Sequence, residues 1–201
     1  MLAILISLDR TLFLFFNSTI SNPLFDGIFT VITHRNTWII PAIVAAGIFI
    51  FREKKRALIV LLLLIITAAI TDPLCVRVLK PLFHRLRPCH PSYFIDGRHL
   101  FLAGGHFLLG YKKSLSFPSA HAMNMFAAAA LLTLLYPKRA VWFYLFAVPV
   151  AFSRIYVGVH YPLDFLAGAI VGSAIGILVF YGYQYIMNNI QARKLKKENT
   201  K

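Results

Sequence analysis

The feature that most constrains this fold is the stretch 165–187, which holds no charged side chain over 23 residues. A helix of about 20 apolar residues matches the roughly 30 Å hydrocarbon core of a bilayer. Backbone polar groups in that core must be satisfied within the segment, so such a run is expected to cross as a helix. The chain is therefore expected to fold within a membrane.

Four further apolar runs are expected to cross as well: 57–79, 122–136, 140–155 and 38–51, the last in a helix that begins near Val31. The composition agrees, with 59% hydrophobic and only 14% charged residues, against about 25% charged in soluble domains. The sequence thus predicts an all-α, polytopic transmembrane helical bundle in a single membrane-embedded domain, 1–190.

The first thirty residues are harder to assign. Asp9 and Arg10 interrupt the apolar residues, and Asn22-Pro23 is expected to break the helix. An amphipathic segment in the interface, with Phe13 and its neighbours inserted, is the favoured reading. A sixth span is the alternative, so the prediction is five to six spans, with an interfacial N-terminal helix and an outer-face loop.

The net charge of +14 comes mainly from bases beside the apolar runs, which favours membrane topology and excludes nucleic acid as the preferred partner. Five spans place three basic clusters on one face, which the positive-inside rule makes cytoplasmic. The basic tail, 191–201, is expected to be cytoplasmic and disordered. The inner membrane is the expected location. The clusters comprise Arg52, Lys54, Lys55 and Arg56; Lys138 and Arg139; and Arg193, Lys194, Lys196, Lys197 and Lys201.

The loop from Lys80 to Pro118 then faces the periplasm or cell exterior, yet it carries six cations on the disfavoured side. Anion binding would explain them. Of the six, we interpret four as solvated loop charges: Arg85, Arg98, Lys112 and Lys113.

Two short motifs carry groups able to move protons. Pro118-Ser119 predicts a helix start with His121 in its first turn, where free backbone N–H groups bind anions. His160 precedes Asp164 by four residues, so the carboxylate can fix the tautomer of the imidazole. Each motif alone is also compatible with a structural role, as a capped helix or an interfacial hydrogen bond.

Together, the order Lys-x6-Arg-Pro, Pro-Ser-x-His, Ser-Arg-x5-His-x3-Asp between Lys80 and Asp164 resembles the signature of the type 2 phosphatidic acid phosphatase (PAP2) superfamily. Ala120 stands where that family commonly has Gly. The resemblance implies that His160 is the nucleophile and forms a phosphohistidine, that Asp164 orients it and that His121 is the general acid. It implies phosphate binding by Lys80, Arg87, Ser119, the backbone at Ala120, and Arg154.

No metal and no cofactor are implied, because fixed cations can stabilise a transferring phosphoryl group. The loop histidines match no zinc spacing. No obligatory protein partner is evident; the expected partners are the bilayer and a phosphorylated lipid. Because Cys75 lies in an apolar run and Cys89 in a polar loop, no disulfide is expected between them.

The predicted function is a lipid phosphatase acting on a phosphate monoester or diphosphate. The candidate substrates are undecaprenyl diphosphate, phosphatidylglycerol phosphate, phosphatidate and the 1-phosphate of lipid A. One alternative is a phosphotransferase that uses the same histidine with a lipid acceptor. The other is a non-catalytic transporter or scaffold with a degenerate site.

Overall fold

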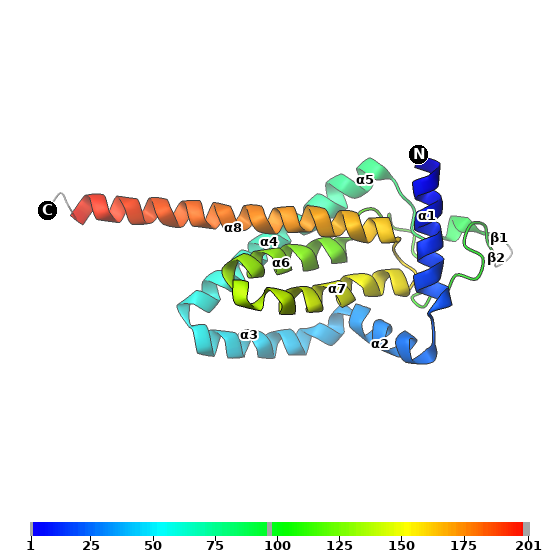
Figure 1. The fold of residues 1–201 in the computed structure, drawn as a ribbon, viewed down its shortest axis with the longest axis horizontal. Coiled ribbons are helices and arrows are strands. Elements are labelled where there is room, and N and C mark those ends of the chain that lie inside the picture. The colour runs from blue at the N-terminus through cyan, green and yellow to red at the C-terminus, as the bar shows by residue number, and fades with distance from the viewer. Residues whose placement is uncertain (1, 96–97, 199–201) are drawn as a thin grey trace.

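A computed structural model describes residues 2–95 and 98–198 of the chain. It is predominantly helical, as predicted (Figure 1). The α-helices are α1 Leu2–Leu14, α2 Pro23–Thr33, α3 Ile39–Glu53, α4 Lys55–Pro73, α5 Lys80–Phe83, α6 Ala120–Leu135, α7 Ala140–Tyr156 and α8 Pro162–Glu198. Shorter turns of helix are η1 Phe15–Thr19, η2 Arg35–Trp38, η3 Leu74–Leu79, η4 Pro91–Tyr93 and η5 Pro137–Arg139. One small hairpin pairs β1 Phe94–Ile95 with β2 Arg98–His99.

The long helices run side by side (Figure 1), and many of their large apolar side chains are exposed on the outside of the bundle. Three segments are long and apolar enough to cross a bilayer: Asn36–Glu53, Lys55–Phe83 and Pro162–Glu198. Helix α6 is a shorter apolar helix. The membrane bundle is confirmed, while the count of five to six spans stays a prediction.

The N-terminal segment bends sharply. Residues Ala3–Thr19 and Pro23–Thr33 meet at 112°, and α1 runs across the direction of α8 (Figure 1). Asn22 caps α2 by accepting a hydrogen bond from the Phe25 backbone N–H at 3.0 Å, so the break falls at the predicted Asn22-Pro23. Together the two segments are long and apolar enough to form one bent span, so the interfacial placement of α1 and the sixth span both stay predictions.

The closest packing in the bundle is between α6 and α8. Three glycines one turn apart on α8, Gly168, Gly172 and Gly176, face the backbone of α6. A Cβ atom at Gly172 would lie 2.1 Å from the Met123 carbonyl oxygen, so only glycine permits this approach. Small residues at such spacing let membrane helices touch backbone to backbone.

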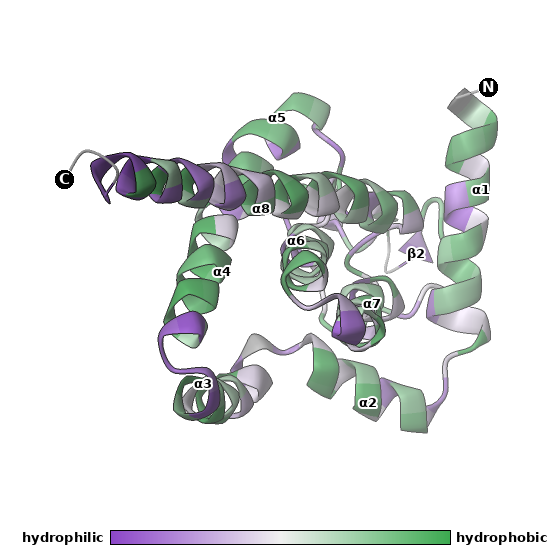
Figure 2. Cartoon of the chain, turned by 60° about the vertical axis from the view of Figure 1, so that its left-hand side comes forward, coloured by the Kyte–Doolittle hydropathy of each residue, from purple (hydrophilic) through white to green (hydrophobic). Residues whose placement is uncertain are grey.

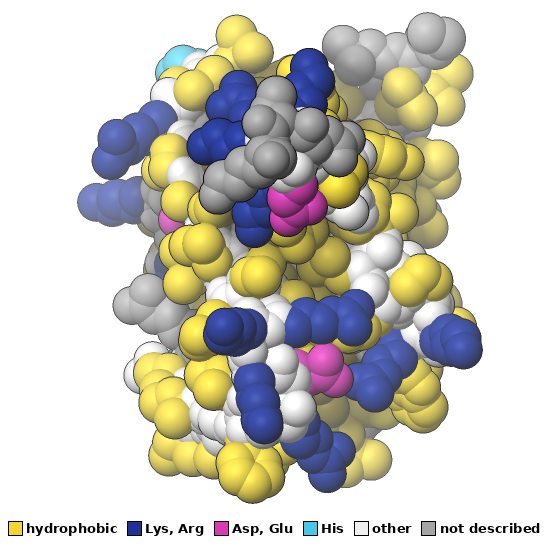
Figure 3. Space-filling model, turned by 90° about the vertical axis from the view of Figure 1, so that its left-hand side faces the viewer, with side chains coloured by type: hydrophobic (Ala, Val, Ile, Leu, Met, Phe, Trp, Pro, Cys, Tyr) yellow, Lys and Arg dark blue, Asp and Glu magenta, His cyan; other side chains and the backbone are white. Residues whose placement is uncertain are grey.

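The basic clusters gather at one end of the bundle. Figure 3 shows lysine and arginine side chains over the face that holds the α3–α4 turn, the α6–α7 turn and the end of α8. Hydrophilic residues concentrate there too, whereas the bundle helices are hydrophobic (Figure 2). Helix α8 continues to Glu198, so residues 191–198, which composition predicted to be disordered, are helical; residues 199–201 lie outside the described part.

The long loop between α5 and α6 covers the opposite end of the bundle. It packs on α1 through a buried hydrophobic cluster that includes Phe13, Leu102 and Tyr161. Asn17 on η1 fixes the loop further, since its amide donates to the carbonyls of His106 and Tyr156 at 2.6 and 2.7 Å. The N-terminal segment therefore holds the loop in place.

Candidate active site

The turn between α7 and α8 is shaped by backbone hydrogen bonds. The Arg154 carbonyl accepts from the backbone N–H groups of Val159 and His160, both at 3.1 Å. Gly158 has φ +84° in this turn, and a Cβ atom there would lie 2.9 Å from the His106 carbonyl oxygen. Glycine is needed for both reasons, and the turn points His160 back into the protein.

His160 and Asp164 form the predicted pair. His160 Nδ1 lies 3.2 Å from Asp164 Oδ2, and both side chains are buried. Asp164 is the third residue of α8, and its Oδ2 also accepts from the Tyr161 backbone N–H at 2.9 Å. A carboxylate at this helix position is a common cap, so the helix start itself places Asp164 beside the imidazole.

Burial and surrounding cations keep the imidazole neutral. The pKa of His160 lies well below its ordinary value, first because the ring is buried and then because Arg87, Arg154 and Lys80 are close. With Nδ1–H directed at Asp164, Nε2 carries the lone pair. A neutral ring with a free lone pair is the form that a nucleophile requires.

Arg87 lies directly against that lone pair. Its Nη1 is 3.0 Å from His160 Nε2 and donates to the Val159 carbonyl at 2.9 Å. Its Nε donates to Ser114 Oγ at 2.9 Å. The side chain is buried, and every one of these partners is uncharged, so its positive charge is available to an anion.

Buried Lys80 and half-buried Arg154 supply two more cations with uncharged partners. Lys80 Nζ donates to the Leu115 carbonyl at 2.8 Å. Arg154 Nη1 donates to Thr33 Oγ1 at 2.8 Å, and its buried Nε has no hydrogen-bond partner within the described residues. Uncompensated cations this deep are costly unless they bind something negative.

The start of α6 faces the same turn. Ser119 caps the helix and is buried, and its backbone N–H donates to the Asp164 carbonyl at 2.9 Å. Ala120 is the first helical residue, and His121 follows in the first turn. His121 lies near enough to contribute to the lowered pKa of His160. The structure thus brings the three predicted motifs to one place at the end of the bundle.

Arg85 was assigned wrongly from sequence. It is not a solvated loop charge: Nη1 donates to Asp164 Oδ1 at 2.9 Å, and Nη2 pairs with Asp9. Asp9 also accepts from the Leu163 backbone N–H at 2.8 Å. Asp9 was read only as an interruption of an apolar stretch, since nothing local in the sequence links it to residue 85 or 164.

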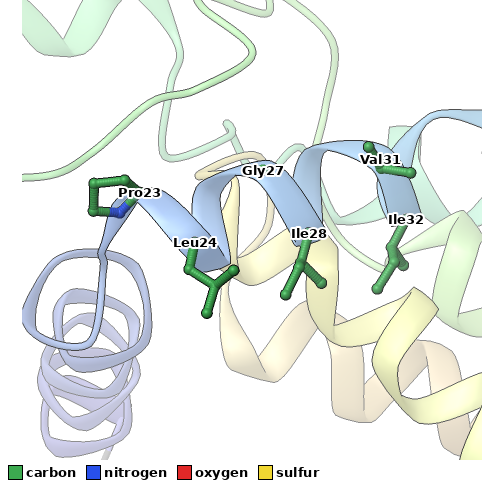
Figure 4. A pocket seen from close by; sticks show the side chains of 6 residues that line it. All are labelled: Pro23, Leu24, Gly27, Ile28, Val31 and Ile32. Carbon is green, nitrogen blue, oxygen red and sulfur yellow. The ribbon is translucent and has the colours of Figure 1, made fainter.

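An apolar cavity of about 760 Å³ opens beside the site. It lies between α3, α4, α6 and α7, with Thr33 and His121 at the site end and Tyr136 and Arg139 at the basic end. A shallower hollow of about 490 Å³ lies along α2 (Figure 4). Its lining is wholly apolar: Pro23, Leu24, Gly27, Ile28, Val31 and Ile32.

The donor set does not suit a metal. Among residues 2–95 and 98–198, no three His, Cys, Asp or Glu side chains gather closely enough to hold an ion. The residues around His160 are instead cations and backbone N–H groups, which bind anions. The expectation of a metal-free site remains a prediction that chelation can test.

The family model of the PAP2 superfamily matches residues 56–188. A lipid A 4'-phosphatase of Bacteroides thetaiotaomicron is 33% identical over 193 residues, covering 90% of this chain and 79% of that protein. A decaprenylphosphoryl-5-phosphoribose phosphatase of Mycobacterium tuberculosis is 32% identical over 149 residues, covering 73% and 71%.

Solved structures agree. The crystal structure of Aquifex aeolicus LpxE matches with a TM-score of 0.64 and 27% identity, covering 85% of this chain and 93% of that one. A transmembrane PAP2-type phosphatidylglycerolphosphate phosphatase from Bacillus subtilis matches with a TM-score of 0.59 and 27% identity, covering 90% and 87%. This chain belongs to the PAP2 superfamily and is a membrane lipid phosphatase.

Proposed function

We propose that the chain hydrolyses a phosphate monoester or diphosphate of a membrane lipid through a phosphohistidine on His160. The observation that supports this most is the buried His160–Asp164 pair with three cations around it, none of which contacts a carboxylate through a hydrogen bond in the described residues. Such a pocket is complementary to the negative charge on a transferring phosphoryl group.

The first step joins His160 Nε2 to phosphorus. Arg87 shares this nitrogen at 3.0 Å; once phosphate oxygens accept from the guanidinium, the lone pair is released for attack. Asp164 stabilises the ring as positive charge develops. The bond from phosphorus to the leaving oxygen breaks, and His121 gives that oxygen a proton.

The second step restores the enzyme. A water molecule attacks the phosphorus of the phosphohistidine, the nitrogen–phosphorus bond breaks, and His121 takes a proton from the water. Lys80, Arg87 and Arg154, with Ser119 and the backbone N–H groups that begin α6, hold the phosphate oxygens through both steps. No metal enters either step.

The apolar cavity supports a lipid substrate. It reaches His121, so a hydrocarbon chain lying in it would leave the phosphate beside the catalytic pair. The four candidate lipids named from sequence remain, and the Bacteroides relative adds lipid A 4'-phosphate, which was not among them.

The orientation is part of the proposal. The site lies at the end of the bundle opposite the basic face of Figure 3. With the basic end cytoplasmic, the site faces the periplasm or the cell exterior of the inner membrane.

A phosphate-release panel tests the function. Purified protein in detergent is given each of the five lipids without an acceptor. Release from at least one lipid is expected, with loss in His160→Ala and retention in His84→Asn. His84 is an exposed loop histidine in the left-handed region, which asparagine tolerates.

The same assay separates the alternatives. In water labelled with ¹⁸O, hydrolysis places the label in the released phosphate, whereas a phosphotransferase releases no phosphate and instead phosphorylates an added lipid acceptor. A transporter or scaffold releases no phosphate from any lipid, and its function survives His160→Ala and His121→Ala; that pair of results overturns the proposal.

A further inference from the structure

Arg85, a half-buried cation beside the site, differs from Lys80, Arg87 and Arg154 in its partners. Both of its terminal nitrogens contact carboxylates: Nη1 contacts Asp164 and Nη2 contacts Asp9. Its guanidinium also lies 4.1 Å above the ring centre of Tyr161. An arginine so engaged has little remaining capacity to bind phosphate.

The backbone of Arg85 is fixed as tightly as its side chain. The chain leaves α5 through His84 at φ +46°, which turns Arg85 toward α8. The Arg85 carbonyl then accepts from the backbone N–H of buried Ser116 at 2.7 Å and from its hydroxyl at 3.2 Å. The guanidinium therefore approaches Asp164 from a preset direction.

Asp9 completes the arrangement from the N-terminal helix. Its Oδ1 accepts from the Leu163 backbone N–H at 2.8 Å, in the first turn of α8. Its Oδ2 contacts Arg85. The buried carboxylate of Asp9 thus contacts both the start of α8 and Arg85, each of which positions Asp164. These contacts are a specific reason for α1 to lie across the bundle.

The charges make Arg85 necessary to this arrangement. Asp9 and Asp164 have fully buried side chains, and Arg85 is the cation between them. Removing it would leave two unpaired carboxylates close together, and such a pair favours taking up a proton on one of them. A protonated or displaced Asp164 would no longer fix the tautomer of His160.

We propose that Arg85 and Asp9 are positioning residues of the reaction. Asp9 holds Arg85, Arg85 binds Oδ1 of Asp164, and Asp164 thereby keeps Oδ2 directed at His160 Nδ1. This rests on the proposed function, in which His160 is the nucleophile, and it assigns to the N-terminal helix a part in catalysis without contact with the substrate.

Kinetics on the best lipid of the panel test the proposal. Arg85→Ala is expected to lower kcat by about 10- to 100-fold, as for groups that orient a catalytic ligand, with KM changed less than about twofold. Arg85→Lys is expected to recover part of the loss. Arg98→Ala, which removes an exposed arginine of the same loop, is expected to match the wild type.

A double variant distinguishes positioning from a general loss of stability. Asp9→Asn keeps an oxygen for the Leu163 N–H but removes one of the carboxylates that Arg85→Ala leaves unpaired. Arg85→Ala with Asp9→Asn is therefore expected to have a higher kcat than Arg85→Ala alone, a coupling that independent sites lack. The proposal is overturned if the losses of the two substitutions are additive, or if Arg85→Ala leaves kcat unchanged. It is also overturned if Arg85→Ala raises KM at normal kcat, because that result means that Arg85 binds the headgroup directly.

The ring state of His160 gives a readout independent of turnover. In ¹⁵N-histidine-labelled protein, the signal lost in His160→Gln identifies this ring. Arg85→Ala is expected to shift it, and Arg98→Ala is not. If wild type releases no phosphate from any lipid, the proposed function fails while this spectrum still decides the positioning; an unshifted signal overturns the positioning alone.

Discussion

The contact of Gly172 with α6 leads to a prediction whose size follows from the structure. A Cβ atom at Gly172 would lie 2.1 Å from the Met123 carbonyl oxygen, about 1.3 Å short of ordinary contact at 3.4 Å. The obstacle is helical backbone, so Gly172→Ala must push α6 and α8 apart by roughly 1 Å. Helix α6 carries Ser119 and His121, and α8 begins beside His160.

Displacement of about 1 Å between reacting groups can cost about 100-fold in rate, equivalent to about 2.7 kcal/mol in the activation barrier. We expect Gly172→Ala to lower kcat by about that factor and to destabilise the fold by about 1–3 kcal/mol through overpacking. Phosphate release and thermal unfolding in detergent measure the two effects on the same sample.

Gly182→Ala is the matched control, because a Cβ atom at Gly182 on the same helix meets nothing within 4 Å. It is expected to retain kcat and to keep or slightly raise the unfolding temperature, since alanine favours helix. If Gly172→Ala keeps the wild-type kcat in folded protein, the α6–α8 separation does not set the geometry of the site and the reasoning is refuted.

Four further predictions concern the proposed site and its setting. Burial and nearby cations lower the pKa of His160, so its ring stays neutral when the pH falls below the ordinary histidine pKa of about 6.5. The acid limb of the kcat/KM profile should therefore have its midpoint below a pH of about 6.5, and a midpoint at or above that pH contradicts the prediction. Ala46→Trp fills the apolar cavity and should raise KM for long-chain lipids at least about tenfold but not for a short-chain phosphate, whereas outward-facing Ile43→Trp should change neither. EDTA should leave turnover unchanged. Loss of turnover in EDTA that a divalent cation restores would contradict the metal-free steps. On intact cells, a membrane-impermeant maleimide should react with Lys113→Cys and not with Lys55→Cys. The native cysteines are buried and should give little background labelling. The reverse pattern would invert the orientation.

Much of the site could be predicted because its motifs are local. Asp164 accepts from the Tyr161 N–H in the first turn of α8, and Ser119 caps α6, so the spacing alone specifies these helix starts. The convergence of Lys80, Arg87 and Arg154 followed from topology, since each lies where an apolar run begins or ends. Local chemistry and the lengths of the spans therefore predicted where these residues lie, while their roles in the reaction came from the resemblance to the PAP2 signature.

The close approach of α6 and α8 has a signal in the sequence. Gly168, Gly172 and Gly176 repeat every four residues, the pattern of small residues at membrane helix contacts. The pattern identifies one face of α8 but not the helix that meets it. The partner depends on the three-dimensional arrangement of the bundle, and only the backbone of α6 at Met123 and Ala127 reveals it.

The helical tail shows the limit of composition as a guide. The residues after 190 are rich in lysine and polar side chains, which favours disorder, yet α8 continues to Glu198. Helix propagation adds one hydrogen bond for each residue fixed, whereas nucleation is the costly step. A preceding span that is already helical removes that cost, so a polar extension can stay helical.

The six cations of the outer loop show why charge alone could not assign roles. Lys80 and Arg87 contact only uncharged groups, Arg85 lies between two carboxylates, and Arg98, Lys112 and Lys113 are exposed. From sequence, Arg85 is expected among the exposed cations of the loop, because its partner Asp9 lies 76 residues away along the chain. Whether a buried cation binds substrate or holds a catalytic residue is decided by its nearest carboxylate, and that carboxylate comes from a different helix.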